Sequence, residues 1–526
     1  MISKKVSLLF ICFVLFACQN DEPENPEVDP IPNGNTVDVI INDEVSLDPT
    51  GYAPLSASIT LETKEPVRVS IKIVGQNGPD SDIIQDFPEI GTNLSIPVLG
   101  LYADFNNTVE LTFFDTSGSN LGVETYRILT EPLIDEMPQI TIEEAKRDQM
   151  AVGMTLVSYF GHSGTPFPQR PFMFDSFGDI RWYLNFSSHP QLGNLFYDNG
   201  MERLTNGNFY FGSGGAGFGG SGDNLIYEID MFGKVVNSWE MVGYGFHHEV
   251  FEKPDGNFLV TVNKLSASTI EDHIIEIDRI SKEIINVWDL NLSLENTRTT
   301  LTNDSQDWFH ANAVTYDETD DTILVSGRTQ ALVKLTANNE VVWIMGPHKD
   351  WGISGNGIDL NQFLLRPLDK DGQPILDQTI LDGDENHPDF EWNWYQHAPL
   401  IMPNKDIMLF DNGDNRNFSG DVDYSRAVVY TLDETNRTVQ QTWQYGKERG
   451  EEVYSRIVSD VDYLESVDHV LFSPGAVFFN SGLYGKSIET DFETGEVIFE
   501  ATIIPPLAFF NIITLHRTER LPLYSD

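Results

Sequence analysis

The sequence predicts an all-β protein, in which a small N-terminal β-sandwich of the immunoglobulin-like type precedes a six-bladed β-propeller. Two observations lead to this fold class: alternating apolar segments early in the chain, and a repeat with a period near fifty residues in the remainder. The composition agrees, because aromatic residues make up 11% of the 526 residues and glycines number 41. Such a chain favours strands joined by many turns, and its length suits a large closed β architecture.

The first seventeen residues have the pattern of a secretory signal. A short basic start precedes an apolar run that ends at Phe16 and is too short to span a bilayer as a permanent helix. The small residue Ala17 then precedes Cys18, a spacing that resembles a lipobox. We therefore expect a lipoprotein signal peptide over residues 1–17 and lipid attachment at Cys18, with an ordinary signal peptide as the alternative.

Residues 18–36 are acidic and rich in proline, which predicts a flexible tether between the lipid and the fold. The stretch directly after Cys18 resembles an export signal of bacterial surface lipoproteins. We expect a protein on the periplasmic side of a bacterial membrane or on the cell surface, held there only by its N-terminal lipid. Cys12 and Cys18 are the only cysteines, so the mature protein has no internal disulfide and no thiol nucleophile.

The net charge of −49 is spread along the chain. It excludes nucleic acid as a partner, because phosphate binding needs a basic face. An anionic substrate would also be repelled at long range, so an anion site has to be built locally from Arg, His and backbone N–H groups.

The sandwich is expected over residues 37–132. This region contains about seven short alternating segments, such as SASITLET and VRVSIKIVG, separated by Gly, Pro and Asn turns. So many short strands in roughly a hundred residues are typical of a small antiparallel sandwich.

The propeller is expected over residues 133–526. Each repeat has an apolar strand, a turn of the Asp-x-x-Gly kind, and two apolar residues that lead to an aromatic anchor. The anchors are Trp182, Trp239, Trp288, Trp343, Trp443 and Phe499. One interval between anchors is 100 residues long, because it contains an insertion at about 347–390. Six units with a period near fifty predict six four-stranded blades.

Three histidines begin the second half of successive repeats. HHEVFEKPDGNFLV aligns with QHAPLIMPNKDIMLF without a gap when His248 is set against His397, and His310 opens a third copy. Because the first strand of a blade runs nearest the propeller axis, we expect these side chains to face one another across one mouth of the channel. Buried histidines are a poor choice for packing, since each must be hydrogen-bonded or neutralised, so the pattern predicts a functional site.

Neighbouring residues complete this candidate site. Asn312 lies two residues beyond His310 and therefore on the same side of the strand. Arg328 follows in an apolar strand and can bind two oxygens of an anion at once. His247 is expected to point to the opposite side, as a structural residue or as one that supports the site residues from outside. The Asp-Asn-Gly of residues 411–413 is a turn signal, and a plain turn is at least as good an interpretation as a catalytic role.

These segments resemble the bacterial aryl-sulfate sulfotransferase family, which does not use a nucleotide sulfate donor. The matching strings are GFHHEVFEKPDGNFLV, DWFHANAVTYDETDDTILVSGRTQALVKL and WYQHAPLIMPNKDIMLFDNGDNR, and GLYADFNNTVELTFFD extends the resemblance into the sandwich. The resemblance implies that His397 is a nucleophile that becomes transiently sulfated. It also implies that four residues hold the sulfate and assist proton movement: His248, His310, Asn312 and Arg328.

The resemblance further implies the reaction. A sulfuryl group moves from a phenolic sulfate ester to a phenolic acceptor, without a cofactor or metal, and the sandwich could mediate a homodimer. Some members form a disulfide in the propeller, but this chain has no cysteine there. In the later blades the match is loose, and it offers Ser455, Ser459, Arg517 and Tyr524 without a strong case for any of them.

The chemistry of the residues is compatible with this reaction. A neutral imidazole is a competent nucleophile at neutral pH, and sulfuryl transfer, like phosphoryl transfer, needs mainly positioning and charge stabilisation. Aryloxide is a fair leaving group, so no nucleotide or metal is chemically required. Which of His248 and His310 moves the proton stays open at this point.

Two other functions are open alternatives. Three histidines are a common metal set, which would make the protein a metal hydrolase or lyase, although Arg328 would repel the cation. A non-enzymatic surface propeller could instead bind a glycan or a protein by stacking on Trp392, Trp394 and Tyr395. A formylglycine sulfatase is disfavoured, because the chain has no C/S-x-P-x-R segment.

Overall fold

The computed structural model describes most of the chain after residue 36. The described ranges are 37–160, 170–193, 196–197, 200–214, 224–420, 424–479, 482–506 and 513–525. The predicted signal peptide, the lipid site Cys18 and the tether lie outside them. In the described part, no helix is both long and apolar enough to cross a membrane.

The N-terminal unit is a sandwich of five strands. They are β1 (Ile40–Leu47), β2 (Ser56–Ile73), β3 (Ile83–Leu99), β4 (Asn106–Phe114) and β5 (Asn120–Leu129). The single turn η1 (Pro79–Ser81) lies between β2 and β3. The alternating segments SASITLET and VRVSIKIVG are two halves of β2, whose pairing shifts register between Glu62 and Val67. The first half pairs with β1 and the second with β4, so long strands replace the expected seven short ones.

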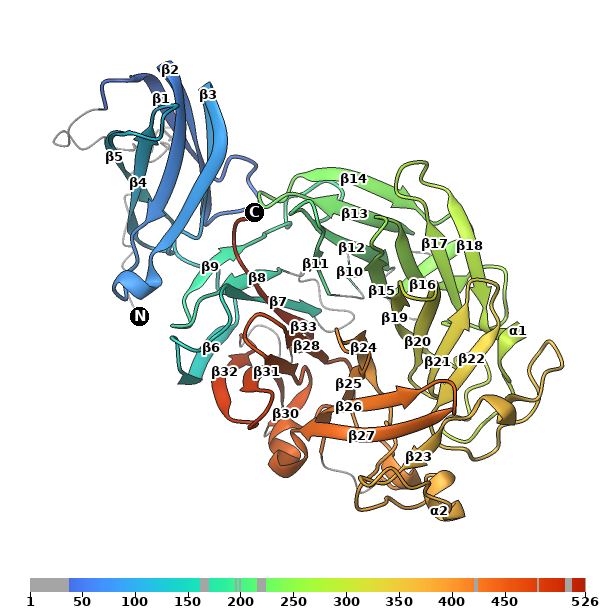
Figure 1. The fold of residues 1–526 in the computed structure, drawn as a ribbon. Helices are drawn as coiled ribbons and strands as arrows, with labels where there is room; N and C mark the ends of the chain where they lie inside the picture. Colours follow the sequence, from blue (N-terminus) through green and yellow to red (C-terminus); the bar gives the residue numbers. More distant parts are fainter. Residues whose placement is uncertain are drawn as a thin grey trace, which may run out of the picture.

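Six further sheets follow, and they arrange around a common centre (Figure 1). The six-bladed propeller and its preceding sandwich are therefore confirmed. Each blade is given from its innermost strand outward. The first blade consists of β33 (Thr514–Leu521), β7 (Met154–Phe160), β8 (Phe172–Phe174) and β9 (Ile180–Tyr183). The second consists of β10 (Phe196–Tyr197) with β11 (Glu202–Arg203), then β12 (Phe209–Gly214), β13 (Leu225–Ile229) and β14 (Val235–Glu240), and the third of β15 (Tyr244–Glu252), β16 (Phe258–Lys264), β17 (His273–Ile277) and β18 (Ile284–Asp289).

The last three blades carry additions to the same plan. The fourth blade consists of β19 (Ala311–Asp317), β20 (Thr322–Gly327), β21 (Leu332–Thr336) and β22 (Val341–Met345). The fifth consists of β24 (His397–Ile401), β25 (Ile407–Asp411), β26 (Arg426–Asp433), β27 (Thr438–Tyr445) and the added strand β23 (Arg366–Leu368). The sixth consists of β28 (Asp460–Leu464), β29 (His469–Ser473), β31 (Gly482–Asp491), β32 (Val497–Ile504) and β6 (Gln139–Ala145), with β30 (Val477–Phe479) beside β31. Short helical turns connect them: α1 (Leu290–Ser293), η2 (Leu360–Phe363), α2 (Gln378–Leu381), η3 (Arg416–Phe418) and η4 (Lys447–Val453).

Both ends of the propeller domain take part in closing the ring. The C-terminal strand β33 is the innermost strand of the first blade, where it pairs with β7. At the other end, β6 pairs with β32 on the outer edge of the sixth blade. The closed ring leaves few free strand edges, and it brings the last segment of the chain to the centre.

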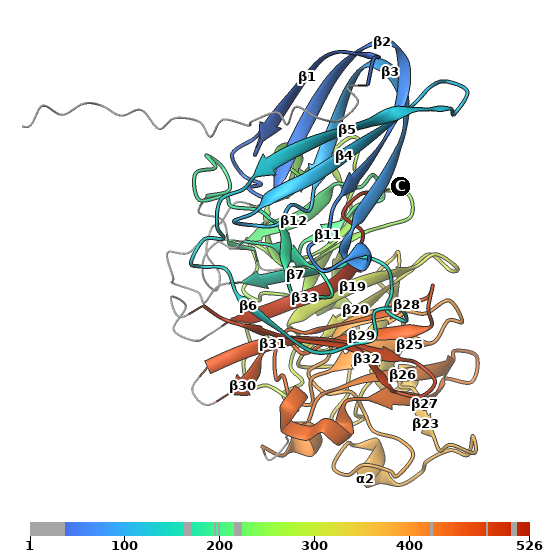
Figure 2. The same ribbon diagram turned by 90° about the vertical axis from the view of Figure 1, so that its left-hand side faces the viewer.

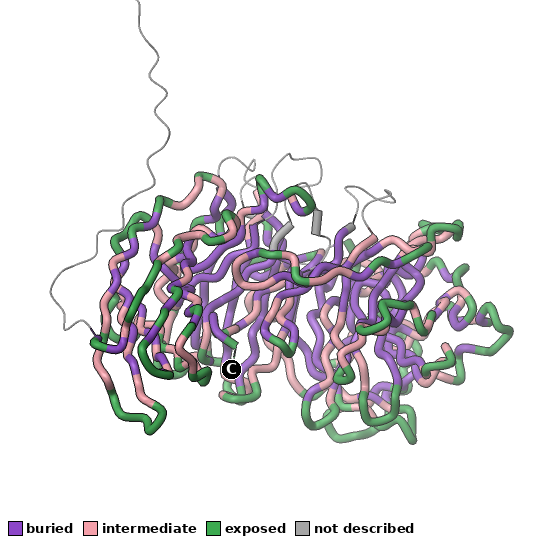
Figure 3. Tube along the Cα trace, turned by 90° about the horizontal axis from the view of Figure 1, so that it is seen from above, coloured by how far each residue is buried: buried purple, intermediate pink, exposed green. Residues whose placement is uncertain are grey.

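The predicted aromatic anchors lie on the outermost strand of each four-stranded unit. Trp182 Nε1 donates a hydrogen bond to Met231 O of the second blade at 2.8 Å, and Trp239 Nε1 donates to Arg279 O of the third at 2.9 Å. Trp288 Nε1 donates to Thr336 O of the fourth blade, and Trp343 Nε1 donates to the carboxylate of Glu434 in the fifth, both at 2.9 Å. These four anchors thus pack their own blade and tie it to the next, which explains why the repeat is readable in the sequence. Buried residues accordingly concentrate in the strands and exposed ones in the outer turns (Figure 3).

The insertion at about 347–390 enlarges the periphery of the fifth blade. Its strand β23 pairs in parallel with β27, outside the four antiparallel strands. This strand lies on the outer edge of the sheet, at the end opposite to the innermost strand β24.

The sandwich stands against one side of the propeller (Figure 2). Arg181 of β9 is fully buried and donates two hydrogen bonds to Gly100 O, at 3.0 and 2.7 Å, while its guanidinium lies 3.6 Å from the Tyr102 ring centre. Tyr524 Oη accepts a hydrogen bond from Leu99 N at 2.8 Å. Tyr524 therefore belongs to the contact between the domains.

Candidate functional site

The predicted site is built on irregular backbone in three neighbouring innermost strands. The pairing shifts register in β15 between Phe246 and Val250, in β19 near Ala311, and in β24 just after His397. His248 and His310 have φ values of 62° and 54°, in the left-handed region that side chains other than glycine rarely adopt. Bulges re-aim side chains, and left-handed residues persist where the surroundings enforce them, often at functional sites.

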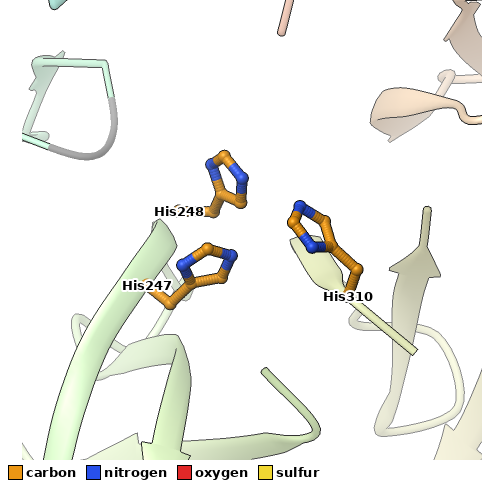
Figure 4. Close-up of side chains that lie close together, drawn as sticks. All are labelled: His247, His248 and His310. Atoms are coloured by element: carbon orange, nitrogen blue, oxygen red, sulfur yellow. The ribbon is translucent and has the colours of Figure 1, made fainter. Parts of the chain in front are cut away.

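The structure brings the three predicted histidines together. The ring centre of His248 lies 5.4 Å from that of His310 and 6.1 Å from that of His397. All three side chains are almost fully buried. His247, expected on the opposite side, is instead part of the cluster, with its ring 4.1 Å from His248 and 5.2 Å from His310 (Figure 4). The alternation rule fails here because the bulge interrupts the pleat.

The hydrogen bonds of His397 fix its tautomer. Asn412 Nδ2 donates to Ser455 O at 2.8 Å and to Val458 O at 2.9 Å, so Asn412 Oδ1 faces the imidazole. His397 Nδ1 lies 2.7 Å from that oxygen and 3.2 Å from Tyr395 O. Because both partners only accept, Nδ1 carries the proton and Nε2 of the neutral ring carries a free lone pair.

The surroundings also keep His397 uncharged. Burial lowers the pKa of His397 well below its usual value, and the nearby charge of Arg328 lowers it further. A neutral imidazole with an unprotonated Nε2 is the form that can act as a nucleophile.

His310 has the opposite character. Burial alone would lower the pKa of His310, but the carboxylates of Glu271 and Asp307 raise it above the usual value. His310 Nδ1 donates a hydrogen bond to Asp307 Oδ2 at 2.8 Å and lies 2.6 Å from Glu271 Oε2. The site therefore contains one neutral and one cation-forming imidazole.

His248 occupies the middle of the cluster. Burial, together with the surrounding imidazoles, lowers the pKa of His248 well below its usual value. Its Nδ1 lies 3.4 Å from Nε2 of His516, a residue of β33 that the sequence did not single out. Only the closure of the ring brings this C-terminal histidine beside the others.

Arg328 and Asn312 hold the backbone of the site together. Arg328 N donates to His310 O at 3.0 Å, and Asn312 Nδ2 donates to Gln396 O at 2.8 Å. The guanidinium of Arg328 lies 5.3 Å from the Tyr395 ring centre and forms no salt bridge with the residues that the structure describes. Burial lowers the pKa of Arg328. A cation held without a carboxylate partner suits an anionic ligand.

The looser candidates prove to be supporting residues. Ser455 contributes its carbonyl to Asn412, and its Oγ accepts a hydrogen bond from Ser459 Oγ at 2.8 Å. Arg517 is ion-paired with Glu249 at 3.1 Å.

The aromatic residues proposed for glycan stacking are differently placed. Trp392 and Trp394 are 2% and 0% exposed and belong to the apolar core of the fourth and fifth blades. They are therefore closed to a ligand that would stack on their faces. The Asp-Asn-Gly of residues 411–413 combines the two roles considered for it. Gly413 makes a turn with a φ of 79°, and Asn412 contacts His397.

The metal alternative has a geometric counterpart. Nitrogens of His247, His248 and His310 lie within 4.8 Å of one another. However, His247 Nε2 and His310 Nδ1 both lie within 3 Å of Glu271 Oε2, at 2.9 and 2.6 Å, which are distances of ion pairs between imidazoles and a carboxylate. Glu271, Asp307 and His310 form a second group of this kind. The charge of Arg328 acts on His310, which belongs to both groups, and a positive charge there opposes the binding of a cation.

Fold and site together define a six-bladed propeller with a buried cluster of histidines beside Arg328. The chain belongs to the arylsulfotransferase (ASST) family, whose sequence profile matches residues 139–505, while the profile of the arylsulfotransferase Ig-like domain matches residues 44–131. The predicted family is thereby confirmed.

Two relatives cover nearly the whole chain. An arylsulfate sulfotransferase AssT of Escherichia coli O6:H1 is 27% identical over 88% of this chain and 90% of its own length. The arylsulfate sulfotransferase AssT of Lelliottia amnigena is 28% identical over 90% of this chain and 92% of its own length. Among solved structures, the Dos1 propeller aligns with a TM-score of 0.31 at 10% identity, over 69% of this chain and 74% of its own.

Proposed function

We propose that this protein is an aryl-sulfate sulfotransferase, which moves a sulfuryl group from a phenolic sulfate ester to a phenolic acceptor through a sulfo-histidine on His397. The observation that carries the proposal is the hydrogen bond between His397 Nδ1 and Asn412 Oδ1, which leaves Nε2 free to attack. The two relatives named as arylsulfate sulfotransferases support the substrate class.

In the first half-reaction, the donor's sulfuryl group sits against Arg328 and the buried histidines. His397 Nε2 forms a bond to sulfur while the bond between sulfur and the phenolic oxygen breaks. Arg328 offers paired N–H donors to the sulfuryl oxygens, whose charge changes little in a loose, in-line transfer. His310, in its protonated form, gives its proton to the departing phenolate.

In the second half-reaction, the acceptor phenol returns that proton. His310 is now neutral, so it accepts the proton of the acceptor hydroxyl as the phenolic oxygen attacks sulfur. The bond between sulfur and Nε2 breaks, and His397 regains its neutral form. The cycle produces no net proton, and every charge needed for it lies on the residues described above.

Neutral His248 has a different part. Its low pKa keeps it uncharged, so it can donate one N–H to a sulfuryl oxygen without holding the product as tightly as a second cation would. Asn312 places its amide between His310 and the residue before His397, and so keeps the two reacting histidines in register.

We also propose, from the sequence pattern, that the mature chain is anchored by lipid at Cys18 on the periplasmic side of the membrane or on the cell surface. Homodimerisation through the sandwich is a further expectation from the family.

The function is tested by rapid quenching of the full-length enzyme with a chromogenic aryl sulfate in the absence of acceptor, followed by peptide mass spectrometry. We expect a sulfuryl adduct on His397, lost upon addition of a phenol. His397→Ala should give neither adduct nor exchange, whereas His387→Ala, in the peripheral insertion, should give both. An active wild-type enzyme without an adduct on His397 would overturn the mechanism.

A further inference from the structure

Glu271 is a buried carboxylate that neither the sequence pattern nor the family resemblance singled out. It lies two residues before β17, is 3% exposed, and directs one oxygen, Oε2, at two imidazoles. That oxygen lies 2.6 Å from His310 Nδ1 and 2.9 Å from His247 Nε2. Buried charges are costly unless they are paired, so the two rings and this carboxylate form one electrostatic unit.

The backbone holds Glu271 in place from both sides. Glu271 N donates to Asn263 Oδ1 at 2.6 Å, and Ala311 N donates to Glu271 O at 2.8 Å. The second bond links Glu271 directly to the residue after His310. Glu271 also has a φ of 57°, a left-handed conformation that costs on the order of 1–3 kcal/mol in a non-glycine residue. The fold thus maintains a strained backbone that aims this carboxylate at His310.

We infer that Glu271 is the positioning residue that keeps His310 protonated before the donor reacts, and that His310 rather than His248 is therefore the acid–base residue of the transfer. The inference rests on the function proposed above. It resolves the question that the sequence left open, since the two histidines occupy similar positions in neighbouring blades but only His310 is paired with carboxylates.

Every charged or titratable group around His310 fits this division of roles. Arg328, from the end of β20, opposes a positive charge on His310, and the imidazoles of β15 and β24 add no negative charge. Only Glu271 and Asp307 favour the charge. The side chain of Asp307 is 26% exposed and that of Glu271 is 4% exposed, so water screens Asp307 more. Asp307 orients the ring through its hydrogen bond, while Glu271 supplies most of the electrostatic support.

Glu271→Gln tests the inference, because it keeps the shape of the side chain and removes its charge. Release of the chromogenic phenol is followed by stopped flow in a single donor half-reaction, from about pH 5 to pH 10. In the wild type the rate should fall as the pH rises through the pKa of His310. In Glu271→Gln that fall should move to lower pH by about 1 unit or more, the usual effect of losing one nearby opposite charge.

Two further variants separate positioning from folding. Glu271→Asp retains the charge and should restore the wild-type profile at least in part. Glu276→Gln removes a buried carboxylate of β17 that pairs with Lys253 at 2.7 Å, away from the imidazoles. It should leave unchanged the pH midpoint at which phenol release slows. Calorimetric binding of inorganic sulfate to the resting enzyme gives a readout without chemistry. Its affinity should also fall at lower pH in Glu271→Gln than in the wild type.

The outcomes distinguish this inference from the proposed function. A wild-type enzyme that releases no phenol refutes the function itself. A wild type that reacts, together with a Glu271→Gln enzyme whose midpoints for phenol release and sulfate binding are both unshifted, overturns the role of Glu271. A shift that Glu276→Gln reproduces equally would also overturn it, because the effect would then not depend on contact with His310.

Discussion

Asn412 Oδ1 lies 2.7 Å from His397 Nδ1, and this contact determines which nitrogen of His397 carries the proton. The amide cannot turn over without cost, because its Nδ2 already donates to Ser455 O and Val458 O. The fifth and sixth blades thus cooperate to set the tautomer. A side chain at a tight turn controls a residue fifteen positions earlier in the chain.

Asn412→Asp should change the acid side of the pH profile. A carboxylate beside Nδ1 favours the imidazolium, so it raises the pKa of His397, by about 1–3 units for a close charge. Since only the neutral ring attacks, the donor half-reaction should then lose rate as the pH falls through this raised pKa, in a range where the wild type stays active. Single-turnover rates between about pH 4 and pH 8 check this. If the acid limb of the pH profile is unchanged in Asn412→Asp, Asn412 does not set the tautomer of His397.

The same variant should also be less stable. Two buried carbonyls lose their donor, which costs about 1–3 kcal/mol each when they stay unsatisfied. Denaturant unfolding should show a lower midpoint with little change in slope. Asn415→Asp, nearby but outside the hydrogen bonds of His397, serves as the control.

Much of the architecture was predictable because it follows from local pattern. The six aromatic anchors recur since each outer strand must pack its blade and reach the next, and an indole such as that of Trp239 does both. His248 and His397 were detectable for the same reason: each lies four residues before the pair that closes its hairpin, Glu252 with Phe258 and Ile401 with Ile407.

The rest of the site depends on tertiary contacts that leave no periodic trace. His247 was assigned to the wrong side because alternation assumes an unbroken pleat, and the bulge in β15 breaks it. Glu271 follows an ordinary turn, and its importance comes only from the fold of the neighbouring blade against it. His516 reaches the centre through ring closure, which pairs the two ends of the propeller domain.

Arg328→Gln should weaken catalysis in two separable ways. Loss of the paired N–H donors should lower kcat/KM by about 100-fold or more, in the range found when one charge-stabilising donor is removed. Loss of the positive charge should also raise the pKa of His397, because Arg328 is one cause of its low value. The acid limb should therefore move to higher pH. Arg328→Lys restores the positive charge but not the paired N–H donors of the guanidinium. It should therefore return the acid limb of the pH profile to its wild-type position but restore only part of kcat/KM.

Chelation should leave the activity intact. The nitrogens of the histidine cluster lie close enough to suggest a metal site, but the proposed chemistry uses only protein groups. We expect the same exchange rate after prolonged dialysis against a strong chelator as before. Metal analysis of the purified enzyme provides the complementary measurement. Loss of activity that returns on adding zinc or iron would favour the metal hydrolase or lyase alternative.

The N-terminal pattern predicts a change of compartment for Cys18→Ser. Without the cysteine the lipid has no attachment site, and the protein should move from the membrane fraction to the soluble fraction of the envelope. Labelling with a fatty acid should disappear at the same time. Cys12→Ser, inside the predicted signal peptide, should keep both label and fractionation, and equal loss in the two variants would contradict attachment at Cys18.

The two half-reactions should depend on pH in opposite directions, because His310 gives a proton in one and takes it in the other. Its pKa is raised, so the charged form exists below that pKa and is lost as the pH rises through it. Donor cleavage should therefore slow toward high pH. Transfer to the acceptor needs neutral His310, so it should slow toward low pH once the sulfo-enzyme is allowed to equilibrate. A double-mixing experiment that forms the sulfo-enzyme first and adds phenol at a second pH separates the steps. If both rates follow the pH in the same direction, His310 does not carry the proton through the cycle.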